Sequence, residues 1–127
     1  QELSYIKKNI EFTFTPHILP MFRGILSTIY LNYKSKANLN KIYNELRRFY
    51  MNHKFIKILK NKALSTNDVI NTNNCQISVC KSKDKKKLII LSSIDNLIKG
   101  GAGQAVQNLN LIYNFKLDEG LKWDTFQ

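Results

Sequence analysis

The chain has 127 residues, of which 43% are apolar and 11% aromatic. This size suits one compact domain with a core and is too small for a typical two-domain enzyme. The net charge is +11, but the basic residues are mostly lysines scattered among Asn and Ile rather than gathered in a stripe. The charge alone therefore gives little support for nucleic-acid binding, and no apolar run reaches the length of a membrane span.

The first half of the chain predicts two strands and a helix. Alternating apolar and polar residues predict a strand over residues 10–15, which Pro16 and Pro20 bring to an end. A run rich in β-branched and aromatic residues predicts a longer strand over about 25–33. Six apolar residues fall on one helical stripe and predict an amphipathic helix, namely Leu39, Ile42, Tyr43, Leu46, Phe49 and Tyr50.

The second half predicts three strands and a second helix. A short strand over 54–59 is followed by a polar loop rich in Asn, Ser and Thr. Two further strands, 75–80 and 87–94, are joined by a lysine-rich segment that is typical of a solvated hairpin tip. The last helix begins in a glycine cluster and is marked by Ala105, Val106, Leu109, Ile112 and Tyr113.

This order of elements predicts an α+β fold with a mixed, largely antiparallel sheet that helices cover on one face. Two helices are too few to cover both faces. A bare second face would be an apolar liability, so this layout predicts a partner, either another subunit or an adjacent domain.

Cys75 and Cys80 are the only cysteines, and no His or Cys pair lies near them at metal-ligand spacing. On a strand they point to opposite faces, which argues against a disulfide between them. We expect two free thiols in a reducing compartment and no metal site.

The glycine cluster Gly100, Gly101, Ala102, Gly103 leaves two interpretations open. It lacks the Lys-Ser or Lys-Thr ending of a phosphate-binding loop and the spacing of a dinucleotide fingerprint. Glycines at a helix start allow the backbone to approach a ligand closely and can direct N–H groups toward an anion or carbonyl. The same glycines could instead serve only to pack the helix tightly against a neighbouring element.

His17 and Arg23 are the other candidate site residues. His17 lies between two prolines and could be a structural hydrogen-bond partner or a proton-transfer group. Arg23, beside Gly24, could hold a carboxylate or phosphate, or could form a structural ion pair.

Three blocks of the sequence carry a family resemblance. They are FTPHILPMFRGILSTIY (14–30), LSTNDVINTNNCQISV (64–79) and LSSIDNLIKGGAGQAVQNLNLIY (91–113). In this order and spacing they resemble the C-terminal half of the N-acetyl-gamma-glutamyl-phosphate reductase family, whose fold is similar to the C-terminal domain of glyceraldehyde-phosphate-dehydrogenase-like enzymes. The stretch DNLIKGGAGQAVQN is close to a signature of the family.

The resemblance implies an NADPH-dependent oxidoreductase of arginine biosynthesis that reduces N-acetyl-glutamyl 5-phosphate to the semialdehyde through a cysteine thioester. The nucleophilic cysteine belongs to an absent upstream half, so no catalytic residue is expected in this chain. Asn96 and the Gly100 to Gly103 backbone are expected to line the cofactor pocket. Arg23 and His17 are expected to bind substrate.

The resemblance also implies a division of the chain. Residues 1–95 are expected to form a substrate and oligomerisation domain, and 96–127 a cofactor-side loop and helix that pack on a missing N-terminal nucleotide-binding domain. A homo-oligomer, dimer or tetramer, is expected, in the cytoplasm or in an organelle matrix of bacterial origin. The competing hypothesis from another class is a non-enzymatic basic module that binds nucleic acid or drives oligomerisation, which rests only on the charge.

Overall fold

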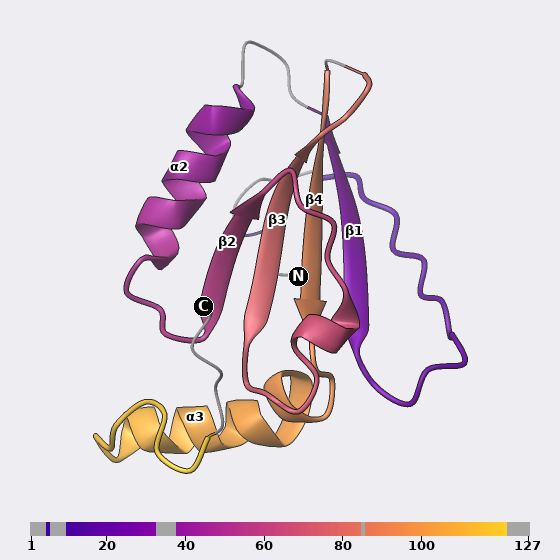
Figure 1. Ribbon diagram of the computed structural model, residues 1–127. Coiled ribbons are helices and arrows are strands. Elements are labelled where there is room, and N and C mark those ends of the chain that lie inside the picture. Colours follow the sequence, from indigo (N-terminus) through magenta and orange to yellow (C-terminus); the bar gives the residue numbers. More distant parts are fainter. Residues whose placement is uncertain (1–4, 6–9, 33–37, 85, 122–127) are drawn as a thin grey trace.

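The computed structural model describes residue 5 and the ranges 10–32, 38–84 and 86–121. Four strands form one sheet in the order β1-β4-β3-β2 (Figure 1). They are β1 (Ile25–Asn32), β2 (Ile56–Lys60), β3 (Cys75–Lys81) and β4 (Lys87–Ile94). β4 pairs antiparallel with both β1 and β3, whereas β2 pairs parallel with β3. The predicted α+β class with a mixed, largely antiparallel sheet is confirmed.

Helix α2 (Leu39–Tyr50) confirms the amphipathic prediction and covers part of one sheet face. Asn38 caps it, because its side-chain oxygen accepts a hydrogen bond from the Asn40 N–H at 2.9 Å. The helix packs against β2 and β3. The core of this contact comprises Leu39, Ile42, Leu46, Val79, Leu88 and Ile90.

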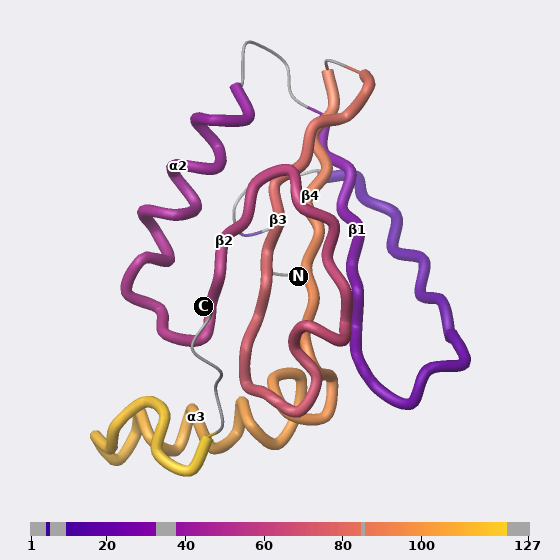
Figure 2. Tube along the Cα trace, in the orientation of Figure 1, coloured from indigo at the N-terminus to yellow at the C-terminus, as the bar shows by residue number. Residues whose placement is uncertain are grey.

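The opposite face of the sheet is partly covered by the segment that crosses from β2 to β3, which passes over it in Figure 2. This segment contains the short 3-10 helix η1 (Thr66–Asp68) and the fully buried Val69. Ser78 and Ser93 lie on the sheet face opposite to Val79, and both bond to the crossover segment. The Lys62 N–H donates to Ser78 Oγ, and the Ser93 hydroxyl donates to the Ser65 carbonyl, each at 3.2 Å. The crossover segment therefore covers the middle of the sheet face that α2 leaves open.

Helix α3 (Gly103–Ile112) begins in the glycine cluster as predicted and follows η2 (Ile98–Ala102), a π-helical turn. It lies across one end of the sheet rather than on a face (Figure 1). Its apolar residues are partly or largely exposed: Val106 is 38% exposed, Leu109 47% and Ile112 73%.

The predicted strand over 10–15 is wrong, because residues 10–19 have no regular secondary structure and are mostly exposed. Phe12 and Phe14 alternate as in a strand, yet no strand pairs with them among the described residues. β2 begins two positions later than predicted, at Ile56. Tyr33 and Lys85, parts of a predicted strand and of the hairpin tip, lie outside the described residues. Within the described ranges, no helix is both long and apolar enough to cross a bilayer.

Candidate functional site

Asp95, directly after β4, is the buried centre of a polar junction whose other members, Arg23, Gly24, Asn71 and Asn96, are partly or fully exposed. Its carboxylate is fully buried and accepts hydrogen bonds from the N–H groups of Asn71 at 2.7 Å, Leu97 at 2.8 Å and Ile98 at 3.1 Å. Arg23 Nε lies 3.3 Å from Asp95 Oδ2, and Arg23 Nη1 also donates to Asn71 Oδ1. This Asp95 junction ties the start of β1 and the end of the crossover segment to the corner after β4.

Burial would raise the pKa of Asp95, but the backbone hydrogen bonds from Asn71, Ile98 and Leu97 and the charge of Arg23 outweigh it and lower this pKa below its ordinary value. The carboxylate is therefore ionised at neutral pH. Arg23 thus makes the structural ion pair considered above, and its side chain remains 20% exposed.

Asn96 meets the beginning of β1 in the same junction. The Gly24 N–H donates to Asn96 Oδ1 at 2.7 Å, and among the described residues no partner is found for Asn96 Nδ2. Gly24 has φ +108°, and a β-carbon there would lie 2.6 Å from Thr66 Cβ, so only glycine fits. The structure therefore brings together Arg23 and Asn96, which were predicted separately for substrate and cofactor.

The glycine cluster combines tight packing with an unusual backbone. A β-carbon on Gly103 would lie 2.6 Å from both Asn73 Oδ1 and Ile98 Cγ2, so this glycine allows a close contact. Gly101 interrupts the helical backbone, with φ −147° and ψ −113°. Gly100 and Gly101 are exposed, as is Ala102, whereas Gly103 is buried.

Several N–H groups of this cluster are already occupied. Gly100 donates to the Asp95 carbonyl at 2.9 Å and Ala102 to the Leu97 carbonyl at 3.0 Å. Gly103 donates to the carbonyls of Ile98 and Gly101. An anion could bind these three N–H groups only by replacing the hydrogen bonds that they make within the π-turn. A ligand at this position would therefore contact the exposed surface of Gly100–Ala102.

His17 lies outside the Asp95 junction. It is exposed in the irregular segment before β1, and no hydrogen bond or ion pair joins it to the junction among the described residues. Within the same ranges, no group of three His, Cys, Asp or Glu side chains is arranged to hold a metal ion.

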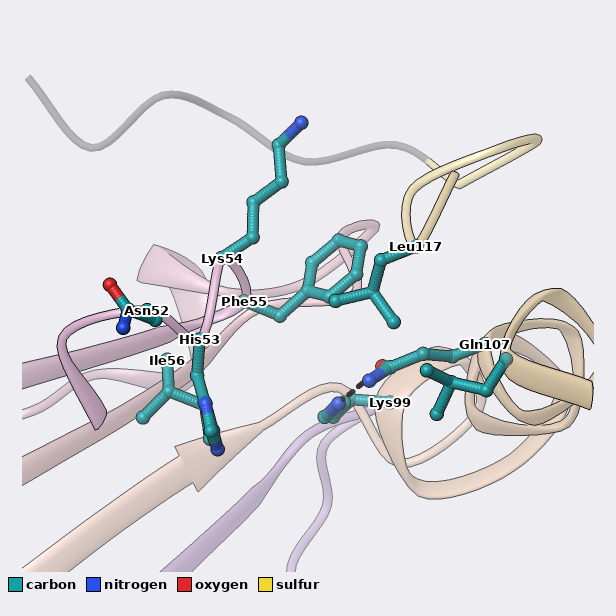
Figure 3. A pocket seen from close by; sticks show the side chains of 9 residues that line it. Asn52, His53, Lys54, Phe55, Ile56, Lys99, Gln107 and Leu117 are labelled. Atoms are coloured by element: carbon teal, nitrogen blue, oxygen red, sulfur yellow. Dashed lines mark hydrogen bonds between the residues drawn. The ribbon is translucent and has the colours of Figure 1, made fainter. Parts of the chain in front are cut away.

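Lys99 and Gln107 form a second polar cluster that sequence reasoning missed. Lys99 Nζ and Asn73 Nδ2 both donate to Gln107 Oε1, at 2.7 and 2.9 Å. Figure 3 shows Lys99 and Gln107 facing each other beside Phe55, on the wall of a pocket of about 210 Å³ between the start of β2 and α3. Their spacing of eight residues, about two helical turns, was the one signal available in the sequence.

Electrostatics in this cluster are set by burial. Burial lowers the pKa of Lys99, against an opposing attraction to Cys75. Burial raises the pKa of the Cys75 thiol, although Ser92 and Lys99 act in the other direction. A raised pKa disfavours the thiolate form of Cys75. Cys75 and Cys80 are both free, and Cys80 contacts Ser78 whereas Cys75 contacts Ser92.

Comparison with known proteins gives one family and a consistent set of relatives. The family model for the semialdehyde dehydrogenase dimerisation domain matches residues 1–96. A protein of Clostridium botulinum strain Eklund 17B, named N-acetyl-gamma-glutamyl-phosphate reductase, is 49% identical over 113 residues, which are 88% of this chain and 33% of the relative.

Two further relatives carry the same name. One from Clostridium beijerinckii is 44% identical over 93% of this chain and 35% of the relative. One from Campylobacter jejuni subsp. doylei is 44% identical over 97% of this chain and 36% of the relative. The chain thus spans about a third of the length of these relatives. On these matches and its α+β fold, the chain belongs to the semialdehyde dehydrogenase dimerisation-domain family.

Proposed function

We propose that the chain is the C-terminal part of an N-acetyl-gamma-glutamyl-phosphate reductase that uses NADPH in arginine biosynthesis. The carrying observation is the 44–49% identity to three relatives of that name over 88–97% of this chain. In the proposed reaction a cysteine thiolate outside this chain displaces phosphate from N-acetyl-glutamyl 5-phosphate. NADPH, when bound, would supply the hydride that reduces the resulting thioester to the semialdehyde and frees the thiolate.

Asn96 has the chemistry required to hold a nicotinamide. Its Oδ1 is fixed by the Gly24 N–H, which turns Nδ2 into an oriented donor for the carboxamide oxygen of NADPH. The exposed backbone of Gly100, Gly101 and Ala102 adds a surface without bulky side chains, and buried Gly103 holds this surface in place. Asn96 and the backbone of Gly100, Gly101 and Ala102 would orient the nicotinamide ring, from which NADPH supplies the hydride.

Arg23 is proposed to contact the substrate from the other side of the junction. Two of its nitrogens are engaged by Asp95 and Asn71, which hold the guanidinium rigidly while leaving it partly exposed. A rigid guanidinium can offer its remaining N–H groups to a carboxylate or phosphate with little entropic cost. His17 is proposed as a second substrate contact, brought in from the exposed segment that leads to β1.

The exposed apolar residues of α3 are proposed to dock on the nucleotide-binding domain that lies outside this chain. This follows the division into residues 1–95 and 96–127, with the second part facing the cofactor. Val106, Leu109 and Ile112 carry the proposed contact. A homo-oligomer in the cytoplasm, or in an organelle matrix of bacterial origin, is proposed in keeping with the dimerisation domain of the family.

The test compares the chain alone with a hybrid that joins the upstream part of the Clostridium botulinum relative to this chain. We expect NADPH oxidation that depends on N-acetyl-glutamyl phosphate from the hybrid and none from the chain alone. A correctly folded hybrid that binds NADPH but does not turn over would contradict the proposal. Turnover by the chain alone would show that the nucleophile lies within it.

A further inference from the structure

The two carboxylate oxygens of Asp95 bond to different parts of the Asp95 junction. Oδ2 accepts a hydrogen bond from the Asn71 N–H at 2.7 Å and lies 3.3 Å from Arg23 Nε. Oδ1 accepts hydrogen bonds from the Leu97 N–H at 2.8 Å and the Ile98 N–H at 3.1 Å. Asp95 is 0% exposed, so it cannot touch a ligand itself. Any effect of Asp95 on a ligand must pass through the residues that it holds.

The Oδ1 side of Asp95 sets the position of Asn96. Asn96 follows Asp95 directly, and the hydrogen bonds from Leu97 and Ile98 to Asp95 close a tight turn around it. The Gly24 N–H fixes the side chain of Asn96 from the other direction. A turn of this kind needs only one acceptor oxygen, which asparagine supplies as well as aspartate. The turn alone therefore does not account for a second, charged oxygen at residue 95.

The Oδ2 side of Asp95 sets the position of Arg23. Arg23 Nη1 donates to Asn71 Oδ1 and the Asn71 N–H donates to Asp95, so the three residues form a closed ring. An arginine carries its N–H groups in one fixed plane. With Nε and Nη1 directed at Asp95 and Asn71, no partner is found for Arg23 Nη2 within the described ranges. Asp95 thus fixes the direction in which Arg23 presents its remaining N–H groups.

We propose that Asp95 is a positioning residue that serves both ligands: its Oδ1 holds Asn96 in place for the cofactor, and its Oδ2 holds Arg23 in place for the substrate. The inference rests on the proposed function, because it takes Asn96 and Arg23 as the two ligand contacts. One buried carboxylate then sets where the nicotinamide and an anionic group of the substrate lie relative to each other. A purely structural Asp95 would stabilise the fold without a selective effect on either ligand.

The first test is Asp95→Asn in the hybrid described above. The amide keeps one acceptor oxygen for the turn, but its NH2 group would face the N–H groups of Asn71 and Arg23, so the Arg23 side is lost. KM for N-acetyl-glutamyl phosphate is expected to rise at least about tenfold. The dissociation constant of NADPH, measured by fluorescence titration, is expected to change less than about twofold. Any other pattern in a folded variant overturns the proposal.

A second pair of variants decides the matter if the unpaired Arg23 prevents folding. Arg23→Gln is combined with Asp95→Asn or with Asp95→Ala, so that no buried charge is left without its partner. The first combination is expected to keep the NADPH affinity and to add nothing to the effect of Arg23→Gln alone on KM for the acyl phosphate. The second loses the acceptor of the turn and is expected to bind NADPH at least about tenfold more weakly. Equal NADPH affinities in the two combinations overturn the proposal.

Val79→Ala is the control for lost stability. Val79 is fully buried in the core between α2 and the sheet. The variant is expected to unfold more easily but to keep both ligand constants within about twofold of those of the unsubstituted hybrid. If it changes them as Asp95→Asn does, the proposal is wrong. Failure of the proposed function looks different, because the hybrid would then not turn over before any substitution, and the role of Asp95 would fall with it.

Discussion

Gly103 lies so close to Asn73 that a β-carbon on the glycine would fall 2.6 Å from Asn73 Oδ1 and 2.8 Å from the carbonyl oxygen of Ile98. The contact joins the first turn of α3 to the end of the crossover segment, which also bonds to Asp95 and Gln107. The backbone carbonyl has little freedom to move away, so the size of residue 103 sets how closely these two segments approach.

Gly103→Ala is expected to destabilise the chain by about 1–3 kcal/mol, since the clash outweighs the better helix propensity of alanine. Urea unfolding measures the difference. Gly100→Ala is the matched control, because its β-carbon would meet nothing nearer than 3.4 Å. If the two variants unfold at the same urea concentration, the close contact at Gly103 does not restrict the size of this residue.

Asp95→Asn is expected to destabilise the chain by about 3 kcal/mol at neutral pH, because it leaves Arg23 without its buried partner. The pKa of Asp95 is lowered in the folded state, so its contribution is complete above the unfolded pKa and is lost as the pH falls through the folded value. The unfolding free energy of the wild type is therefore expected to drop below about pH 4 more steeply than that of the variant.

Asp84→Asn serves as the control for this prediction. Asp84 is about half exposed, 3.8 Å from Lys87, and its loss is expected to cost less than about 0.5 kcal/mol. Parallel pH profiles for the wild type and Asp95→Asn would show that the buried carboxylate is not the group that titrates.

How much the sequence could predict depends on whether the cause of a feature is local. Helix α2 was predicted correctly because an apolar stripe is a property of residues that are neighbours in the sequence. The strand over 10–15 failed because alternation shows that a segment could join a sheet, not that a partner strand is beside it. The Asp95 junction could not be derived, since Arg23 and Asn71 reach Asp95 only after the whole sheet has formed.

Asn96→Asp separates the structural role of this residue from its proposed role at the cofactor. Aspartate keeps an oxygen for the Gly24 N–H but removes the Nδ2 donor. In an active hybrid, KM for NADPH is expected to rise about tenfold with little change in KM for the acyl phosphate. Asn96→Ala, which loses both groups, is expected to lower stability as well. An unchanged KM for NADPH in Asn96→Asp would leave Asn96 with a structural role only.

Gln107→Ala is expected to destabilise the chain by about 1–3 kcal/mol, because the side chains of Lys99 and Asn73 lose their shared acceptor. Gln104→Ala on the same helix is the control, because within the described part of the chain the Gln104 side chain bonds only to exposed Asn108. A loss of less than about 0.5 kcal/mol is expected. Thermal unfolding of both variants decides whether the hydrogen bonds of Gln107 with Lys99 and Asn73 hold α3 in place.

The pairing of β1 with β4 has a consequence for synthesis of the protein on the ribosome. Gly24 and Asn96 are 72 positions apart, so β1 must wait for almost the whole of the remaining sheet before β4 can meet it. At ordinary elongation rates the wait is roughly 4 to 14 seconds. During that time the uncharged, apolar β1 segment is unpaired in the nascent chain. It is then a natural target for chaperones that bind exposed extended segments.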